Sequence, residues 1–134
     1  MNKDTFIIED NSLEIKLLNI QMIASLIFIG TITVNLLLSY NERLRLENKP
    51  PLFSNKCQSE LSLYNKIIAF ILVLTYFGID IKNVEVANQK NKDTTVLKRD
   101  ILPAFLAIIT SSIILYNAKK NTTNGISEVE NPTL

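Results

Sequence analysis

The sequence predicts an all-α protein, an integral membrane bundle of three transmembrane helices. The overall proportions are ordinary, since 47% of the 134 residues are hydrophobic and 20% are charged. The apolar residues nevertheless gather in three blocks, and the charged residues lie between the blocks. A chain of this length suits one domain. We therefore expect a single membrane domain over residues 1–134, with spans at about 17–40, 61–81 and 101–118.

The first block gives the clearest prediction of a membrane span. No side chain between Lys16 and Glu42 carries a charge at neutral pH. A helix over these residues is roughly 37 Å long, which exceeds the hydrocarbon core of about 30 Å. Just upstream, Asn11 followed by Glu14 matches a helix N-cap with a capping box. The sequence therefore predicts a helix that begins near Asn11 and crosses the membrane.

The second block is shorter. Its uncharged part covers residues 67–79, between Lys66 and Asp80. A span needs about 20 residues, so this block also fits a re-entrant or interfacial segment. Apolar residues on both flanks extend the block to 61–81, and the ammonium group of Lys66 can reach the interface along its flexible stem. We expect a span here.

The third block has no charged residue over 101–118, which is near the lower limit for a span. Pro103 is tolerated in a first helical turn, or else it kinks a helix that begins nearer Thr94 or Thr95. The polar tail, residues 121–134, is expected to be mobile.

Polar loops are expected over 42–60 and 82–100. Pro50 and Pro51 cannot continue a helix, so we expect the first helix to end before them.

Uncharged polar and small side chains form stripes along the blocks. At about 100° per residue, Gln21, Ser25 and Asn35 share one face of the first block. Ala107 and Ser111 have the small-xxx-small spacing of packed membrane helices. Hydrogen bonds between membrane helices contribute about 0.6 to 2 kcal/mol each. These five residues are therefore candidates for helix packing among three helices that face one another, and the alternative is that they line a polar pathway.

The composition argues against an enzyme. The chain has no histidine, which is the commonest general base, and Cys57 is its single cysteine. We expect no catalytic residue, no metal site and no cofactor. Asp80, at the edge of a span, is a speculative ion or proton site, but pairing with Lys82 at the interface explains it more simply. A net charge of +1 predicts no nucleic-acid partner.

The orientation does not follow from the basic residues. With three spans, seven lysine and arginine residues fall on each side of the membrane, so the positive-inside rule does not decide. Because the first span often dominates, we expect the N-terminus outside.

Two motifs resemble those of a protein family. Residues 41–54, NERLRLENKPPLFS, are followed by LSLYNKI at residues 61–67. This pair resembles a pattern in uncharacterised small multi-span membrane proteins of low-GC Gram-positive bacteria, and the similarity covers most of residues 36–117. It implies a membrane protein of the bacterial plasma membrane and carries no specific activity.

The function expected from the sequence is that of a non-enzymatic, small multi-pass membrane protein. Its expected partners are the lipid bilayer and either a second copy of itself or another membrane protein. It would act through helix–helix association, as an oligomer or as an accessory subunit. The first loop, residues 42–60, is the best candidate for a partner surface, because it combines charges with an exposed Leu52 and Phe53. The alternatives are a small oligomeric pore or transporter, and an immunity-type protein against a membrane-active peptide.

Overall fold

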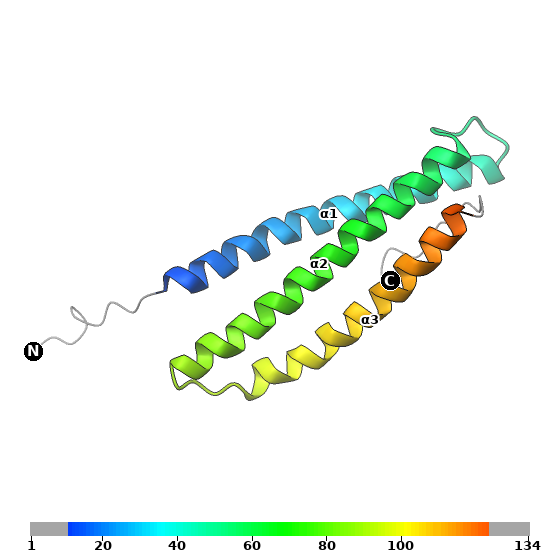
Figure 1. Ribbon diagram of the computed structural model, residues 1–134. Helices are drawn as coiled ribbons and strands as arrows, with labels where there is room; N and C mark the ends of the chain where they lie inside the picture. Colours follow the sequence, from blue (N-terminus) through cyan, green and yellow to red (C-terminus); the bar gives the residue numbers. More distant parts are fainter. Residues whose placement is uncertain (1–10, 124–134) are drawn as a thin grey trace, which may run out of the picture.

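The structure, a computed structural model, describes residues 11–123 and confirms the all-α prediction. It contains α1 (Ser12–Leu46), α2 (Asn55–Gln89) and α3 (Thr95–Thr123), as Figure 1 shows. The helices have 35, 35 and 29 residues. At 1.5 Å per residue they are roughly 52, 52 and 43 Å long, well above the thickness of the hydrocarbon core. All three are long and apolar enough to cross a membrane, which makes this a multi-pass membrane protein.

The three helices are not equivalent, because α2 lies between the other two (Figure 1). Both outer helices pack on α2, and α3 does so more extensively than α1. In the part of the chain that the structure describes, no Cα atom of α1 lies within 8 Å of one in α3. The expectation that all three helices face one another is therefore met only for the two pairs that include α2.

A seven-residue repeat organises the contact between α1 and α2. Leu17, Ala24, Thr31 and Leu38 are buried residues of α1 at intervals of seven. Buried residues of α2 have the same interval: Gln58, Asn65, Leu72, Ile79 and Val86. This repeat is typical of left-handed coiled-coil packing, in which one seam stays against the partner helix.

The second residue of each connection is an asparagine of positive φ. Asn48 has φ 57°, and Lys49 N donates to Leu44 O at 2.8 Å, which is the Schellman arrangement for ending a helix. The same arrangement ends α2, where Asn91 has φ 55°. Asparagine adopts this conformation more readily than most residues. Two asparagine residues thus end the helices at the connections.

The connections are consequently shorter than predicted. They cover 47–54 and 90–94, whereas polar loops were expected over 42–60 and 82–100. The charged residues near these turns are good helix formers, and beyond the bilayer surface they extend each helix into water. Residues 121–123 belong to α3 and not to the mobile tail that was predicted over 121–134. The rest of that predicted tail lies outside the described residues.

The helix starts differ from the predicted caps at one place. Asn11 is the N-cap of α1, but its side chain makes no capping hydrogen bond, so the predicted capping box is absent. The side chains of Asn11 and Glu14 instead accept hydrogen bonds from Lys90. At the start of α2, Ser54 Oγ does accept from Cys57 N, at 3.2 Å.

Pro103 lies inside α3, as the ninth residue of the helix. The structure thus supports the second of the two expectations, a helix that begins at Thr95. Because proline has no N–H, the carbonyl of Arg99 cannot receive the usual helical hydrogen bond from residue 103.

Candidate functional site

The α1–α2 hairpin is organised by one buried amide. The Asn41 side chain is 0% exposed. Its Oδ1 accepts from Leu52 N at 2.7 Å and from Phe53 N at 3.1 Å. Its Nδ2 donates to Phe53 O at 3.2 Å and to Gln58 Oε1 at 2.6 Å. An asparagine amide offers two donors and two acceptor lone pairs, so its full capacity is used. The connecting loop is therefore bonded through its own backbone to the end of α1.

A second set of side chains completes this network. Gln58 is also 0% exposed, and its Nε2 donates to Glu42 Oε2 at 3.2 Å. Arg45 Nη2 donates to Phe53 O at 3.2 Å, and Arg45 Nη1 lies 3.4 Å from Glu42 Oε2. In residues 11–123, no buried side-chain nitrogen or oxygen lacks a hydrogen-bond partner. A fully satisfied buried network of this kind specifies one conformation of the loop.

The loop presents one strongly exposed apolar side chain. Leu52 is 56% exposed, although the backbone that carries it is held by Asn41. Nearby, Arg43 and then Lys49 lower the pKa of the Glu47 carboxyl by hydrogen bonding to it. The α1–α2 connection thus combines an exposed leucine with paired charges on a backbone of fixed shape. Because the loop is already ordered, it would lose less conformational entropy when a partner binds.

Deeper in the bundle, a second amide connects α1 to α2. Asn65 is buried, and its Nδ2 donates to Thr31 O at 3.1 Å and to Asn35 Oδ1 at 3.0 Å. Farther from the α1–α2 connection, Ser25 Oγ lies 3.0 Å from Tyr76 Oη. Ser25 already donates its only hydroxyl proton to a backbone carbonyl of its own helix, so Tyr76 is the donor in this pair. Ser25 and Asn35 thus join α1 to α2.

The other packing candidates have different surroundings. Gln21 is exposed on α1, on the edge of a shallow depression with Leu18 and Met22. Gln21 holds the same position of the seven-residue repeat as Asn35, fourteen residues later, so the repeat alone does not decide which of these side chains reaches α2. Ala107 and Ser111 are half-buried on α3 and line a groove beside α2.

This groove has a volume of about 410 Å³ and receives side chains from all three helices. Its small and hydroxyl-bearing residues come from α2 and α3, and Phe28 of α1 forms part of its rim. The lining includes Phe28, Ala69, Tyr76, Ala107, Thr110 and Ser111. Small and hydroxyl-bearing residues of the second and third blocks therefore meet in one place.

Several hydroxyl groups in the spans bond to their own helix. Thr33 Oγ1 donates to Ile29 O at 3.0 Å, and Thr75 Oγ1 donates to Ile71 O at 2.9 Å. Thr110 and Ser112 make the same bond, four residues back, in α3. A hydroxyl satisfied in this way can face lipid without needing water.

Asp80 is half-buried at the end of the second span. The expected pairing with Lys82 is absent, because Lys82 Nζ lies 3.1 Å from Glu85 Oε2 instead. A glutamate three residues further along the helix is within easier reach of the lysine. Within the described residues, no group of three or more histidine, cysteine, aspartate or glutamate side chains is arranged to hold a metal ion.

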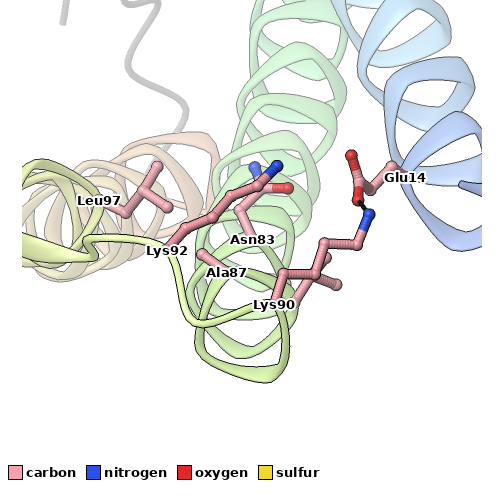
Figure 2. A pocket seen from close by; sticks show the side chains of 7 residues that line it. Glu14, Asn83, Ala87, Lys90, Lys92 and Leu97 are labelled. Carbon is pink, nitrogen blue, oxygen red and sulfur yellow. Dashed lines mark hydrogen bonds and ion pairs between the residues drawn. The ribbon is translucent and has the colours of Figure 1, made fainter. Parts of the chain in front are cut away.

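The opposite end of the bundle contains a pocket of about 220 Å³ between the start of α1 and the α2–α3 connection. Figure 2 shows Lys90 directed at Glu14, while Lys92 extends from the side of Leu97 and Asn83 lies between them on α2. The hydrogen bond from Lys90 lowers the pKa of the Glu14 carboxyl. This ion pair closes the ends of α1 and α2 against each other.

The sequence-based search missed Asn41 and Gln58. Asn41 was noted only as the first residue of the motif at 41–54. Gln58 lies in a segment that was expected to be a loop, so its position on a helix face was not considered. The seven-residue spacing of Gln58 and Asn65 on one helix would have indicated both amides as interface positions. Comparisons with known protein families, with curated proteins and with solved structures found no match.

Proposed function

We propose that this chain is a non-enzymatic membrane protein that acts as an accessory subunit or assembly partner. In this role, the three helices anchor the protein and the α1–α2 hairpin provides a rigid contact surface. The bacterial plasma membrane is the location we propose, in line with the family resemblance of residues 36–117.

The observation that carries the proposal is the saturated network around Asn41. A connection that only joined two helices would need no fixed shape. Here the fully buried amide of Asn41 bonds the loop backbone, and a second fully buried amide, Gln58, bonds Asn41. The residue held in this way, Leu52, is exposed rather than packed into the bundle. Exposed apolar side chains on a rigid loop are favourable contact residues for a partner protein.

A pore is less well supported. The span hydroxyls of Thr33, Thr75, Thr110 and Ser112 are satisfied by their own helices, which suits contact with lipid or with other helices.

Photo-crosslinking in intact cells tests the proposal. A photoreactive amino acid at Leu52 is expected to give a discrete adduct, either with a second copy or with another membrane protein. The control position is Val96, which is also exposed but lies at the opposite end of the bundle. The adduct should be lost when Asn41→Leu is added, because the loop then loses its shape.

Two results would contradict the proposal. The first is the same set of adducts from positions 52 and 96. The second is an adduct at position 52 that persists unchanged in Asn41→Leu, provided that spectroscopy shows the loop to be released in that variant.

A further inference from the structure

Three exposed tyrosines lie at the hairpin end of the bundle, one on each helix. Tyr40 directly precedes Asn41, Tyr64 lies in the N-terminal third of α2, and Tyr116 lies close to the end of α3. Figure 1 shows the end of α3 beside the α1–α2 connection. The remaining tyrosine, Tyr76, is bonded to Ser25 inside the bundle. Exposed tyrosines are enriched where the bilayer meets water, so these three mark a membrane boundary.

Basic residues follow directly outside this boundary. Arg43 lies three residues beyond Tyr40, and Lys119 and Lys120 lie three and four residues beyond Tyr116. These spacings correspond to about 5 to 6 Å along a helix, which is the depth of the headgroup layer. Lys66 Nζ donates to Ser62 Oγ at 3.0 Å, one turn closer to the hairpin, so its ammonium group is directed out of the bilayer. Arg43, Lys66, Lys119 and Lys120 are named the basic collar below.

The charge balance differs between the two ends of the bundle. Over the described residues, the hairpin end carries seven basic side chains and three acidic ones, a net charge of +4. The basic ones are Arg43, Arg45, Lys49, Lys56, Lys66, Lys119 and Lys120, and the acidic ones are Glu42, Glu47 and Glu60.

The opposite end carries six basic side chains and five acidic ones, a net charge of +1. Ion pairs occur at both ends. At this end Lys82 pairs with Glu85 and Lys90 with Glu14. At the hairpin end Glu47 pairs with Arg43 and Lys49, and Glu42 pairs with Arg45. The number of basic residues is nearly the same at the two ends. The difference in net charge comes mainly from the acidic residues, of which the hairpin end has fewer. Attraction to a charged surface depends on both signs.

We propose that the basic collar binds anionic phospholipid headgroups, and that the hairpin end therefore lies at the cytoplasmic leaflet, where such lipids create a negative surface potential. This lipid contact is independent of the partner surface at Leu52. It places the start of α1 on the outer side of the membrane.

Native mass spectrometry tests the lipid preference on the full chain, released from bilayers of equal phosphatidylglycerol and phosphatidylcholine. The native protein is expected to retain phosphatidylglycerol preferentially. In the double variant Lys119→Gln/Lys120→Gln, this preference should fall about fivefold for each lysine removed. The matched control is Lys98→Gln/Arg99→Gln, which removes a basic pair from the other end of the same helix. It should retain the native preference. Equal losses in both variants, or no preference in the native protein, would refute the proposal.

Cys57 tests the sidedness. It is exposed, it lies at the hairpin end, and it is the only cysteine of the chain. A membrane-impermeant maleimide is expected to label it in inverted membrane vesicles and to leave it unlabelled in intact cells. Labelling in intact cells would place the hairpin end outside and overturn the cytoplasmic assignment.

Discussion

The two interfaces of α2 are built on different chemistry. Directional hydrogen bonds join α1 to α2 at successive levels, from Asn41–Gln58 at the hairpin, through the amide of Asn65, to Lys90 at the opposite end. The contact with α3 includes the rings of Phe77 and Phe105, whose centroids are 6.3 Å apart. Farther along α3, Ala118 is 3% exposed.

The difference shows two ways of holding helices together in lipid. No hydrophobic force draws membrane helices to each other, because acyl chains solvate their side chains equally well. Hydrogen bonds between helices specify which residues lie opposite one another, since each donor needs its acceptor. Small residues instead allow close approach and many weak dispersion contacts. The first interface therefore depends on polar identity, and the second depends on side-chain size.

The largest expected effect comes from overpacking the second interface. Ala118→Leu adds three carbon atoms at a buried site, which should lower the free energy of unfolding by about 1 to 3 kcal/mol. Thermal unfolding in detergent micelles measures this loss. Ile113→Leu, at a position 56% exposed on the same helix, is the control and should leave stability unchanged. If both variants behave alike, size does not govern the contact between α2 and α3.

A smaller effect is expected from removing the intramembrane amide. Asn65→Leu abolishes the hydrogen bonds to Thr31 and Asn35 and should cost about 1 kcal/mol. A double-mutant cycle with Asn35→Leu isolates the bond between the two amides, and a coupling energy is expected. Thr75→Val is the control, because the Thr75 hydroxyl bonds only to its own helix. Additive effects of the two asparagine variants would mean that the amides do not fix the register.

The smallest effect concerns the ion pair at the far end. The hydrogen bond from Lys90 lowers the folded-state pKa of Glu14 below its value in the unfolded chain. The pair therefore stabilises the fold above the ordinary glutamate pKa of about 4.3, and this contribution is lost as the pH falls through the lower folded-state pKa. Thermal unfolding measured from about pH 6 downward should show a steeper loss for the native chain than for Glu14→Gln. Parallel pH profiles would show that the pair does not hold α1 against α2.

The sequence predicted the fold class and only part of the candidate site. Ser25 and Asn35 were proposed as packing residues, and the structure bonds both of them to α2. Gln21 shared their face on a helical wheel, and it holds the same position of the seven-residue repeat as Asn35, yet its side chain is exposed. Asn41 lies just past the first predicted span, so nothing in the local pattern distinguished it from an ordinary interfacial residue.

By itself the sequence determined that three helices form and that each can cross a bilayer. Both properties are sums of side-chain contributions along one continuous segment, so they can be evaluated without knowing what lies opposite. Only the tertiary structure decided that α2 lies between the other helices and that Asn41 fixes the hairpin. These features depend on pairs far apart in the chain, such as Ser25 and Tyr76, 51 residues apart. Whether such a hydrogen bond forms depends on the positions of both its donor and its acceptor, and here the two groups come from different segments of the chain.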